Sequence, residues 1–221
     1  MRHPILLSLA AAAALATTAA AQDNPCSTKL PRLPAVGAWS EYQADSGNFR
    51  MMYVGHETAG ERLEMAMTRT MRNGQTGNMV MQIVVPSFPY EMTQAKEVVM
   101  QMGENPPMKL SQQMLDMMRS RMPSNQSISP EACNRLARVG SESVTVPAGT
   151  FSTTHYRDAQ DSTDVWIDTS VPFGMVKVVA RRGTIMLKAK GTGGTTGIHG
   201  TPQEMGPGMM GPQGGRRPGG R

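Results

Sequence analysis

Methionine is the residue type whose number and spacing in this sequence could support chemistry. The chain holds 21 methionines against 11 leucines. On stretches that alternate like β-strands they recur two residues apart, as Met65 with Met67, Met79 with Met81, and Met100 with Met102. Residues two apart in a strand point to the same face, so each pair would place two thioethers side by side. Such pairs could fill irregular gaps in a core, line an adaptable apolar pocket, or bind Cu(I) as soft ligands, and we rank the three interpretations in that order.

The acidic residues and histidines favour structure over catalysis. Four aspartates fall close together, at Asp158, Asp161, Asp164 and Asp168. The first three are three residues apart and lack the glycine of an EF-hand calcium loop, so we expect solvated turns. His56 and His155 have no further His or Cys at zinc-ligand spacing. Because a Gly-x-Ser-x-Gly nucleophile motif is also absent, the sequence predicts a protein that is not an enzyme and holds no metal or cofactor.

The first 21 residues have the pattern of a secretory signal peptide. A short positive start, Met1–His3, precedes the small and apolar run Ile5–Leu15, and Ala19–Ala21 completes an A-x-A site. We expect cleavage before Gln22. The apolar run is shorter than the ~20 residues that cross a bilayer, so the sequence predicts no membrane-spanning segment. We expect a soluble protein that is exported to the periplasm or the extracellular space.

Cys26 and Cys133 are the two cysteines of the chain. In an exported protein an even number of cysteines favours a disulfide. The spacing suits neither a redox CxxC pair nor a zinc site. We therefore expect a structural Cys26–Cys133 disulfide that ties the start of the mature chain to the loop around Pro130–Ala132.

The C-terminal end departs from globular composition. Of the 31 residues from Gly191 to Arg221, 16 are Gly or Pro, so we expect residues 191–221 to be a disordered tail. Residues 22–190 then form a single β-rich domain, and their number suits one core. This part carries a net charge of +2, from 18 basic and 16 acidic residues. It lacks basic runs interleaved with aromatic residues, so nucleic-acid binding is not predicted.

The elements that would position the methionines form an antiparallel meander in the first half of the domain. Alternating segments between turn residues predict strands at Val36–Gln43, Phe49–His56, Arg62–Arg72 and Asn78–Val85. Asn73-Gly74, between the last two, is a strong hairpin signal. Ala95–Met102 favours a fifth strand over a helix. Leu110–Met122 is the clearest helix, because an apolar stripe that includes Met114 and Met118 recurs at helical spacing.

The second half is the most regularly patterned part of the chain. It predicts strands at Glu142–Val146, Thr150–Arg157, Asp164–Asp168, Met175–Ala180 and Thr184–Lys190. Pro147–Gly149 forms a β-turn with Pro in its second position, and Pro172–Gly174 bends the chain before the last hairpin. Every unusual residue in this stretch has an explanation in a sheet or a turn.

Three segments carry a resemblance to known proteins: SVTVPAGTFSTTHYRD, DVWIDTSVPFGMVKV and EVVMQMGENPPM. They resemble a group of uncharacterised exported bacterial β-rich proteins with VPAGTF and VPFG-[LM]-VK motifs, over most of Val36–Leu187. That group is more loosely similar to the LolA/LolB-type periplasmic lipoprotein carriers, which are open antiparallel half-barrels with a helix over a concave face that binds acyl chains. The resemblance implies this fold and a hydrophobic ligand.

The sequence thus predicts a mainly β domain, an antiparallel half-barrel or open barrel with one packed helix. We expect an exported, non-enzymatic binding protein of the cell envelope whose partner is an apolar or amphipathic small molecule or lipid. A structural envelope protein with a filled core and no ligand is the alternative, and methionine-based Cu(I) binding is a minor one. The candidate pocket residues are Trp39, Met65, Met67, Met79, Met81, Met114, Met118 and Trp166.

Overall fold

A computed structural model describes Pro25 and residues 32–45, 47–70, 76–121, 130–181 and 183–205, with the backbone alone at 69, 70, 121, 130 and 131. The predicted signal peptide, the Asn73-Gly74 turn and the last residues of the predicted tail lie outside this part of the chain.

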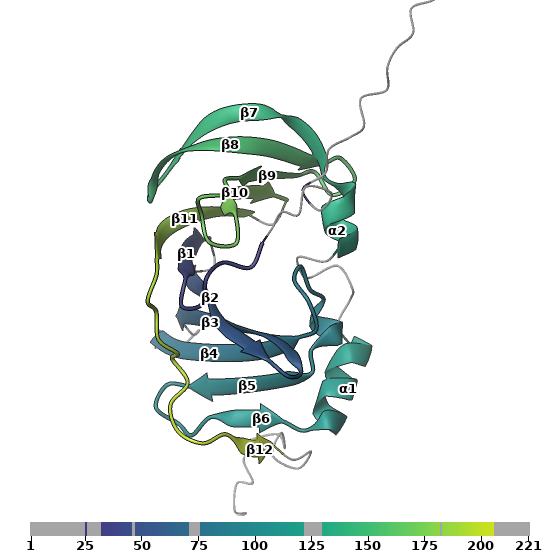
Figure 1. The fold of residues 1–221 in the computed structure, drawn as a ribbon, viewed down its shortest axis with the longest axis vertical. Coiled ribbons are helices and arrows are strands. Elements are labelled where there is room, and N and C mark those ends of the chain that lie inside the picture. Colours follow the sequence, from purple (N-terminus) through teal and green to yellow (C-terminus); the bar gives the residue numbers. More distant parts are fainter. Residues whose placement is uncertain are drawn as a thin grey trace, which may run out of the picture.

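Within the described residues the strands form one 12-stranded sheet that curls without closing (Figure 1). The strands are β1 (Trp39–Ala44), β2 (Gly47–Glu57), β3 (Gly60–Thr70), β4 (Thr76–Val85), β5 (Glu97–Met102), β6 (Met108–Leu110), β7 (Ala137–Val146), β8 (Gly149–Asp158), β9 (Thr163–Ile167), β10 (Met175–Ala180), β11 (Gly183–Gly191) and β12 (Gln203–Met205). Their order is β12-β6-β5-β4-β3-β2-β1-β11-β10-β9-β8-β7. β12 runs parallel to β6, and the other neighbours are antiparallel. The predicted open, mainly β fold is confirmed.

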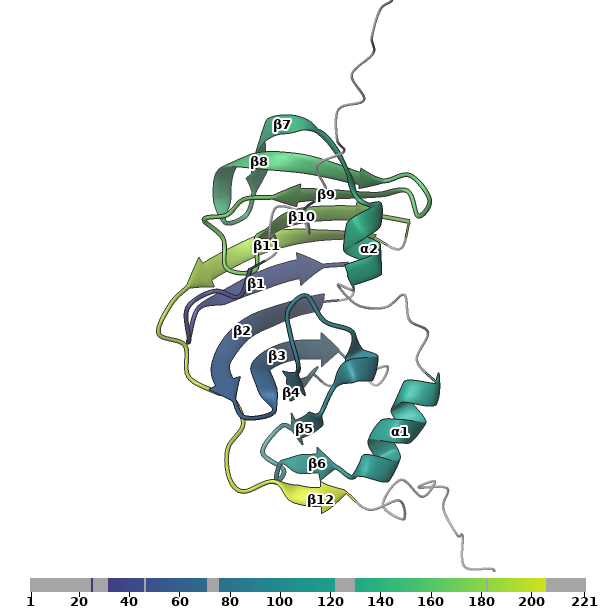
Figure 2. The same ribbon diagram turned by 45° about the vertical axis from the view of Figure 1, so that its right-hand side comes forward.

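The helices lie beside the sheet at one end of the strands (Figure 2). α1 (Gln112–Arg121) falls inside the predicted helix and follows β6 directly. A short 3₁₀ turn, η1 (Met92–Gln94), contacts α1 from the β4–β5 connection. α2 (Pro130–Arg135) forms where the sequence suggested only a loop, and it contacts β8.

The core covers one face of the sheet, here called the inner face. Tyr42, Leu63, Ile83 and Leu187 are buried there, on β1, β3, β4 and β11. The connections between strands add aromatic rings to the same core. The ring of Phe88 lies 6.1 Å from that of Tyr90 and 5.9 Å from that of Phe173. Two connections, β4–β5 and β9–β10, therefore meet over the inner face.

The chain after β11 differs from the predicted tail. Residues 192–202, here called the strap, cross the opposite, outer face of the sheet and lead to β12 (Figure 1). Glycine permits this close approach, because a Cβ at Gly194 would lie 2.7 Å from the sulfur of Met52. Only the part of the expected tail beyond residue 205 lies outside the described residues.

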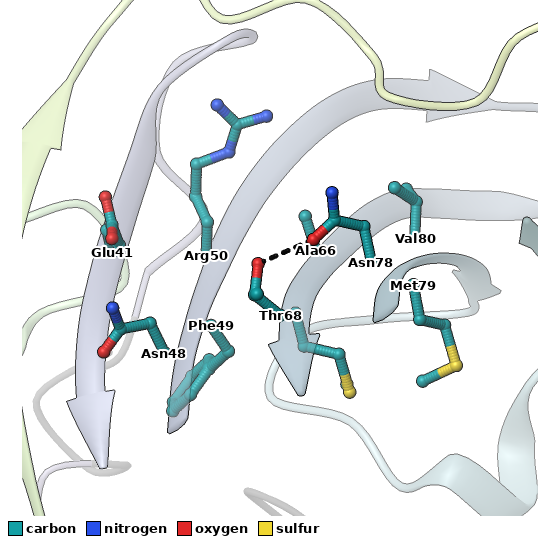
Figure 3. Close-up of a pocket in the computed structure, with 10 residues that line it drawn as sticks. Glu41, Asn48, Phe49, Arg50, Ala66, Thr68, Asn78, Met79 and Val80 are labelled. Carbon is teal, nitrogen blue, oxygen red and sulfur yellow. Dashed lines mark hydrogen bonds between the residues drawn. The ribbon is translucent and has the colours of Figure 1, made fainter. Parts of the chain in front are cut away.

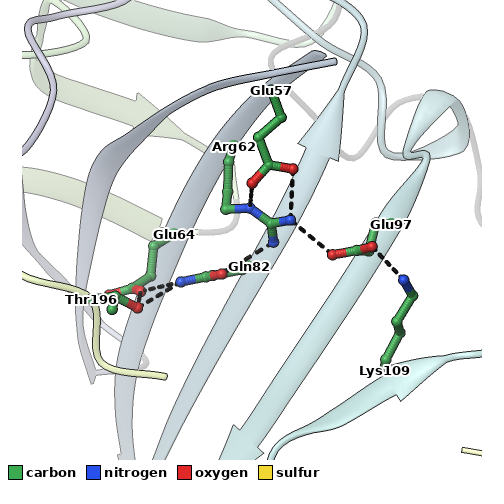
Figure 4. A network of polar contacts seen from close by, with 7 residues as sticks. All are labelled: Glu57, Arg62, Glu64, Gln82, Glu97, Lys109 and Thr196. Carbon is green, nitrogen blue, oxygen red and sulfur yellow. Dashed lines mark hydrogen bonds and ion pairs between the residues drawn. The ribbon is translucent and has the colours of Figure 1, made fainter. Parts of the chain in front are cut away.

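Polar side chains of the sheet hold the strap in place. Glu64 accepts hydrogen bonds from the Thr196 hydroxyl at 2.7 Å and from the Gly197 N–H at 3.1 Å. The His199 N–H donates to Gln101 Oε1 at 2.7 Å. Figure 4 shows Thr196, Glu64 and Gln82 joined to the ion pairs of Arg62 with Glu57 and Glu97. Composition alone misses such anchoring, because the strap is held by polar contacts and not by its own apolar side chains.

Candidate functional site

The methionines of β2 to β6 form two rows across the inner face. Directly opposed residues on successive strands make the first row, which consists of Met51, Met65, Met81, Met100 and Met108. The second row consists of Phe49, Met67, Met79 and Met102. Directly opposed residues share a face of the sheet, with Cβ atoms about 4.5–5.5 Å apart. We call the eight methionines of these rows the methionine surface.

The methionine surface is only partly covered. Met51 is 4% exposed, whereas Met102 is 55% exposed. The remaining six methionines are half-buried. A filled core would bury such side chains completely, so this face keeps thioethers in reach of solvent on the four strands β3, β4, β5 and β6.

Helix α1 adds two of the predicted pocket residues to the same cluster. Met114 is buried, Met118 is half-buried, and both pack in the core cluster to which Met65 and Met81 belong. The Arg119 guanidinium donates to the Ala95 carbonyl at 2.7 Å, which ties the helix to the β4–β5 connection. The structure therefore brings six of the eight predicted pocket residues to the inner side of β3 and β4 or to α1 beside them.

The two predicted tryptophans lie elsewhere. Trp39 is on the outer face, where the strap passes close to its ring and the Arg50 guanidinium lies 5.8 Å from the ring centre. Trp166 stacks on His155 with ring centres 4.4 Å apart, and its indole N–H donates to Glu142 at 2.6 Å. Neither ring borders the methionine surface.

The cluster around Trp166 is polar. His155 Nε2 lies 2.7 Å from Asp164, its Nδ1 lies 3.3 Å from Glu142, and the Lys177 ammonium lies 5.0 Å from the Trp166 ring centre. These contacts join β7, β8, β9 and β10. They give each group of the cluster a partner within the sheet.

The aspartates that could suggest a calcium site instead serve turns and ion pairs. Asp158 lies 2.8 Å from the Arg135 guanidinium and accepts from the N–H groups of Gln160 and Asp161. Burial alone would raise the pKa of the Asp158 carboxyl, but the hydrogen bonds from Arg135 and the two backbone N–H groups outweigh burial and lower this pKa. Asp168 accepts from the Ser170 N–H at 2.8 Å within the β9–β10 turn. In the described part of the chain, His, Cys, Asp and Glu form no group of three suited to a metal ion.

A pocket of about 310 Å³ opens near the hairpin ends of β1 to β4, and its lining includes Phe49, Met67 and Met79 of the second row (Figure 3). Ala66 and Val80 line it together with the polar side chains of Asn48, Arg50 and Asn78. The Thr68 hydroxyl donates to Asn78 Oδ1 at 3.0 Å. The surface of this pocket is open and combines polar with apolar side chains. It can form hydrogen bonds with a polar group but does not enclose one.

Two further pockets, which the sequence did not indicate, share Phe173. One of about 240 Å³ lies between α2 and β8 to β10, and one of about 310 Å³ lies between residues 32–38 and 169–174. Their residues are spread over distant segments, so no local motif reports them. The one local feature of the sequence that could draw attention to these pockets is the bulky Phe173 before Gly174 in a tight turn.

Cys133 is buried and lines the smaller of these pockets together with Pro25. Cys26 lies outside the described residues, so its pairing with Cys133 stays a prediction. None of the helices in the described ranges has the length and apolarity needed to cross a bilayer.

Comparison with known proteins gives distant likenesses. No family model and no curated protein matches this chain. A candidate exported protein with a YmcC-like fold from Bacteroides fragilis is 12% identical, with a TM-score of 0.31 over 72% of this chain and 98% of that one. A candidate lipoprotein from Parabacteroides distasonis is 10% identical, with a TM-score of 0.30 over 72% of this chain and 97% of that one. The resemblance to LolA/LolB-type carriers stays a prediction.

Proposed function

We propose that the protein is an exported, non-enzymatic binding protein for an apolar or amphipathic ligand, and that the methionine surface contacts this ligand. The observation that carries the proposal is the partial exposure of two methionine rows on the inner face of an open sheet. Folding normally removes so large a set of apolar side chains from water. A ligand would complete that burial.

The chemistry of the thioether favours a ligand of variable shape. Methionine is unbranched, rotates about three bonds and has a polarisable sulfur, so a methionine surface can adapt to different apolar shapes. The rows run across five strands, which suits an elongated ligand such as an acyl chain lying across the sheet. Met118 on α1 packs against the same core cluster as Met65 and Met81 and would also contact such a ligand.

Export rests on the signal-peptide pattern of the first 21 residues, with the periplasm or the extracellular space as the destination. A non-enzymatic role fits the side chains that surround the methionine surface, because rows of thioethers supply neither a general base nor a nucleophile.

The test is binding of the neutral dye N-phenyl-1-naphthylamine, whose fluorescence rises in apolar surroundings. We expect the purified protein to bind it and the variant Met65→Gln with Met81→Gln to bind it at least tenfold more weakly, because glutamine keeps the side-chain length but is polar. Met117→Gln is the matched control, since Met117 is exposed on α1 and its loss should leave the affinity unchanged. Near-UV circular dichroism would confirm that both variants fold. Equal affinity in all three proteins would refute a role for the methionine surface.

A structural protein without a ligand is the second candidate, and the meeting of Phe88 and Phe173 over the inner face favours it. Complete absence of dye binding would support this alternative. Cu(I) binding by opposed methionines is a third candidate, because Met65 and Met81 face each other on neighbouring strands. We expect no stoichiometric Cu(I) retention against a chelator, since neutral thioethers would have to hold the ion without a thiolate or imidazole.

A further inference from the structure

The turn between β9 and β10 carries a phenylalanine where its geometry favours glycine. The Gly174 N–H donates to the Val171 carbonyl at 2.8 Å, and Pro172 and Phe173 are the two central residues of this turn. Phe173 has a φ of 64°. In a turn with Pro in the second position and positive φ in the third, glycine is the usual third residue. A bulky residue in this conformation is an outlier, and such outliers concentrate at functional sites.

Burial of the ring keeps Phe173 in this conformation. Its side chain is 4% exposed, and its ring is tilted by 57° against that of Phe88 at 5.9 Å. The Asp168 N–H donates to the Gly174 carbonyl at 2.9 Å, which closes the base of the turn. The turn therefore holds the ring at one place in the molecule at the expense of backbone strain.

Phe173 lies between two pockets and lines both of them. The pocket of about 240 Å³ has an apolar wall formed by Leu136, Val165, Ile167, Met175 and Val178. The pocket of about 310 Å³ borders Leu33, Pro34, Val171 and Thr192. Pockets that hold small molecules usually measure ~300–1,000 Å³. Each pocket alone is at or below the lower end of this range, whereas a joined pocket would fall well inside it.

We propose that Phe173 divides one ligand site, and that this site binds a single alkyl chain with an uncharged polar head. The head lies at Arg135 and the chain runs along β9 and β10 towards Phe173. We call the pocket of about 240 Å³ the first pocket and the pocket of about 310 Å³ that borders Leu33 the second pocket. When the Phe173 ring moves, the chain extends from the first pocket into the second. This site is separate from the methionine surface, and the proposal does not rest on ligand binding there.

The charges beside the first pocket select the head group. Arg135 forms ion pairs with Asp158 at 2.8 Å and with Asp161 at 2.9 Å. One guanidinium and two carboxylates leave a net negative charge, so a carboxylate head would be repelled. A hydroxyl or amide head can donate to an aspartate and accept from the guanidinium. Asp161 is exposed, which places this end of the pocket at the surface.

The affinity for alcohols of increasing chain length tests whether Phe173 divides the site. Calorimetric titration with alkan-1-ols from hexanol to tetradecanol should give roughly fourfold tighter binding per added methylene group while the chain is being buried. In the wild-type protein we expect this gain to end at a chain length that fills the first pocket. In Phe173→Ala the gain should continue to longer chains, because the second pocket becomes accessible. Val165→Phe should fill the first pocket and reduce binding of every alcohol at least tenfold.

The controls separate this site from other sources of binding. The titrations are repeated in the Met65→Gln with Met81→Gln background, which removes alcohol bound at the methionine surface, and the chain-length limit set by Phe173 should remain there, so failure at one site is distinguishable from failure at the other. Fatty acids of equal chain length should bind at least tenfold more weakly, and equal affinity would overturn the assignment of the head group. Phe173→Leu replaces Phe173→Ala if the latter does not fold. An identical chain-length limit in the wild type and in the folded Phe173 variant, or no binding to either, would overturn the proposal.

Discussion

Two carboxylates on the strands are almost completely buried, and the chain surrounds each with hydrogen-bond donors. Glu64 is 2% exposed and Asp158 is 5% exposed. Glu64 accepts from Gln82, Thr196 and Gly197, and Asp158 from Arg135 and two backbone N–H groups. A buried charge without such partners would cost several kcal/mol. Each carboxylate therefore fixes a distant segment to the sheet: the strap in one case and the end of α2 in the other.

The lowered pKa of Asp158 predicts a pH-dependent contribution to stability. A carboxyl with a lower pKa in the folded state stabilises the protein above its unfolded pKa, and this stabilisation is lost as the pH falls through the folded pKa. We expect Asp158→Asn to lower the free energy of unfolding by about 1–3 kcal/mol at pH ~7. The difference from the wild type should shrink as the pH falls from ~5 to ~2, because Asp158 is then protonated in the wild type too.

Urea denaturation across this pH range measures that effect. Asp161→Asn is the control, since the Asp161 side chain is 56% exposed and exposed ion pairs contribute only about 0–1 kcal/mol. A difference between Asp158→Asn and the wild type that stays constant with pH would show that the charge of Asp158 does not stabilise the fold.

Sequence patterns predicted some residue positions better than others. Met65 with Met67 and Met79 with Met81 lie on one face of their strands, as strand periodicity requires. The separation of Trp39 and Trp166 could not be predicted, because it depends on which strands become neighbours. The strain at Phe173 was equally hidden, since a Pro-Phe-Gly sequence does not reveal that Phe173 takes a positive φ as well as Gly174.

At the scale of elements, the strap shows how a glycine-rich segment can be ordered by what lies beneath it. Its residues Thr196, Gly197 and His199 bond to Glu64 and Gln101, which are more than 90 positions earlier in the chain. A compositional rule counts the apolar side chains of the segment itself and therefore predicts disorder. The strands of the meander and helix α1 were predictable because their periodicity is local, whereas β6 and β12, of three residues each, are too short to show any.

Glu64→Gln should release part of the strap. The glutamine amide keeps one acceptor oxygen, but its N–H₂ group faces donors that in the wild type point at the Glu64 carboxylate. Hydrogen bonds to charged groups contribute about 1.5–3 kcal/mol each. Hydrogen exchange of the Gly197 and His199 amides should become at least tenfold faster, with a loss of global stability of about 2–3 kcal/mol. Glu104→Gln is the control, since Glu104 is exposed in a turn. Unchanged protection of both amides would show that Glu64 does not hold the strap.

At the scale of the whole molecule, the two edges of the open sheet are treated differently. β12 covers β6 at one edge, and the strap connects it to the opposite half of the sheet. At the other edge, β7 has a bulge between Arg138 and Gly140. Bulges and short covering strands are the usual means by which proteins keep sheet edges from pairing with other chains. The open architecture was predictable from the strand count and from the resemblance, but the covering of β6 was not, because it needs the part of the chain expected to be disordered.

The predicted Cys26–Cys133 disulfide would tie the start of the mature chain to this architecture. Pro25, the residue before Cys26 in the sequence, is buried and lines the same pocket as Cys133. In the loop-entropy model, a disulfide that closes a loop of about 100 residues raises the free energy of unfolding by roughly 4–5 kcal/mol. Thiol titration of the unfolded, unreduced protein should find no free thiol, and two free thiols per chain would refute the pairing. Cys26→Ser with Cys133→Ser should unfold at a lower urea concentration than the oxidised protein, and reduction of the wild type should lower its midpoint to a similar value while leaving the double variant unchanged.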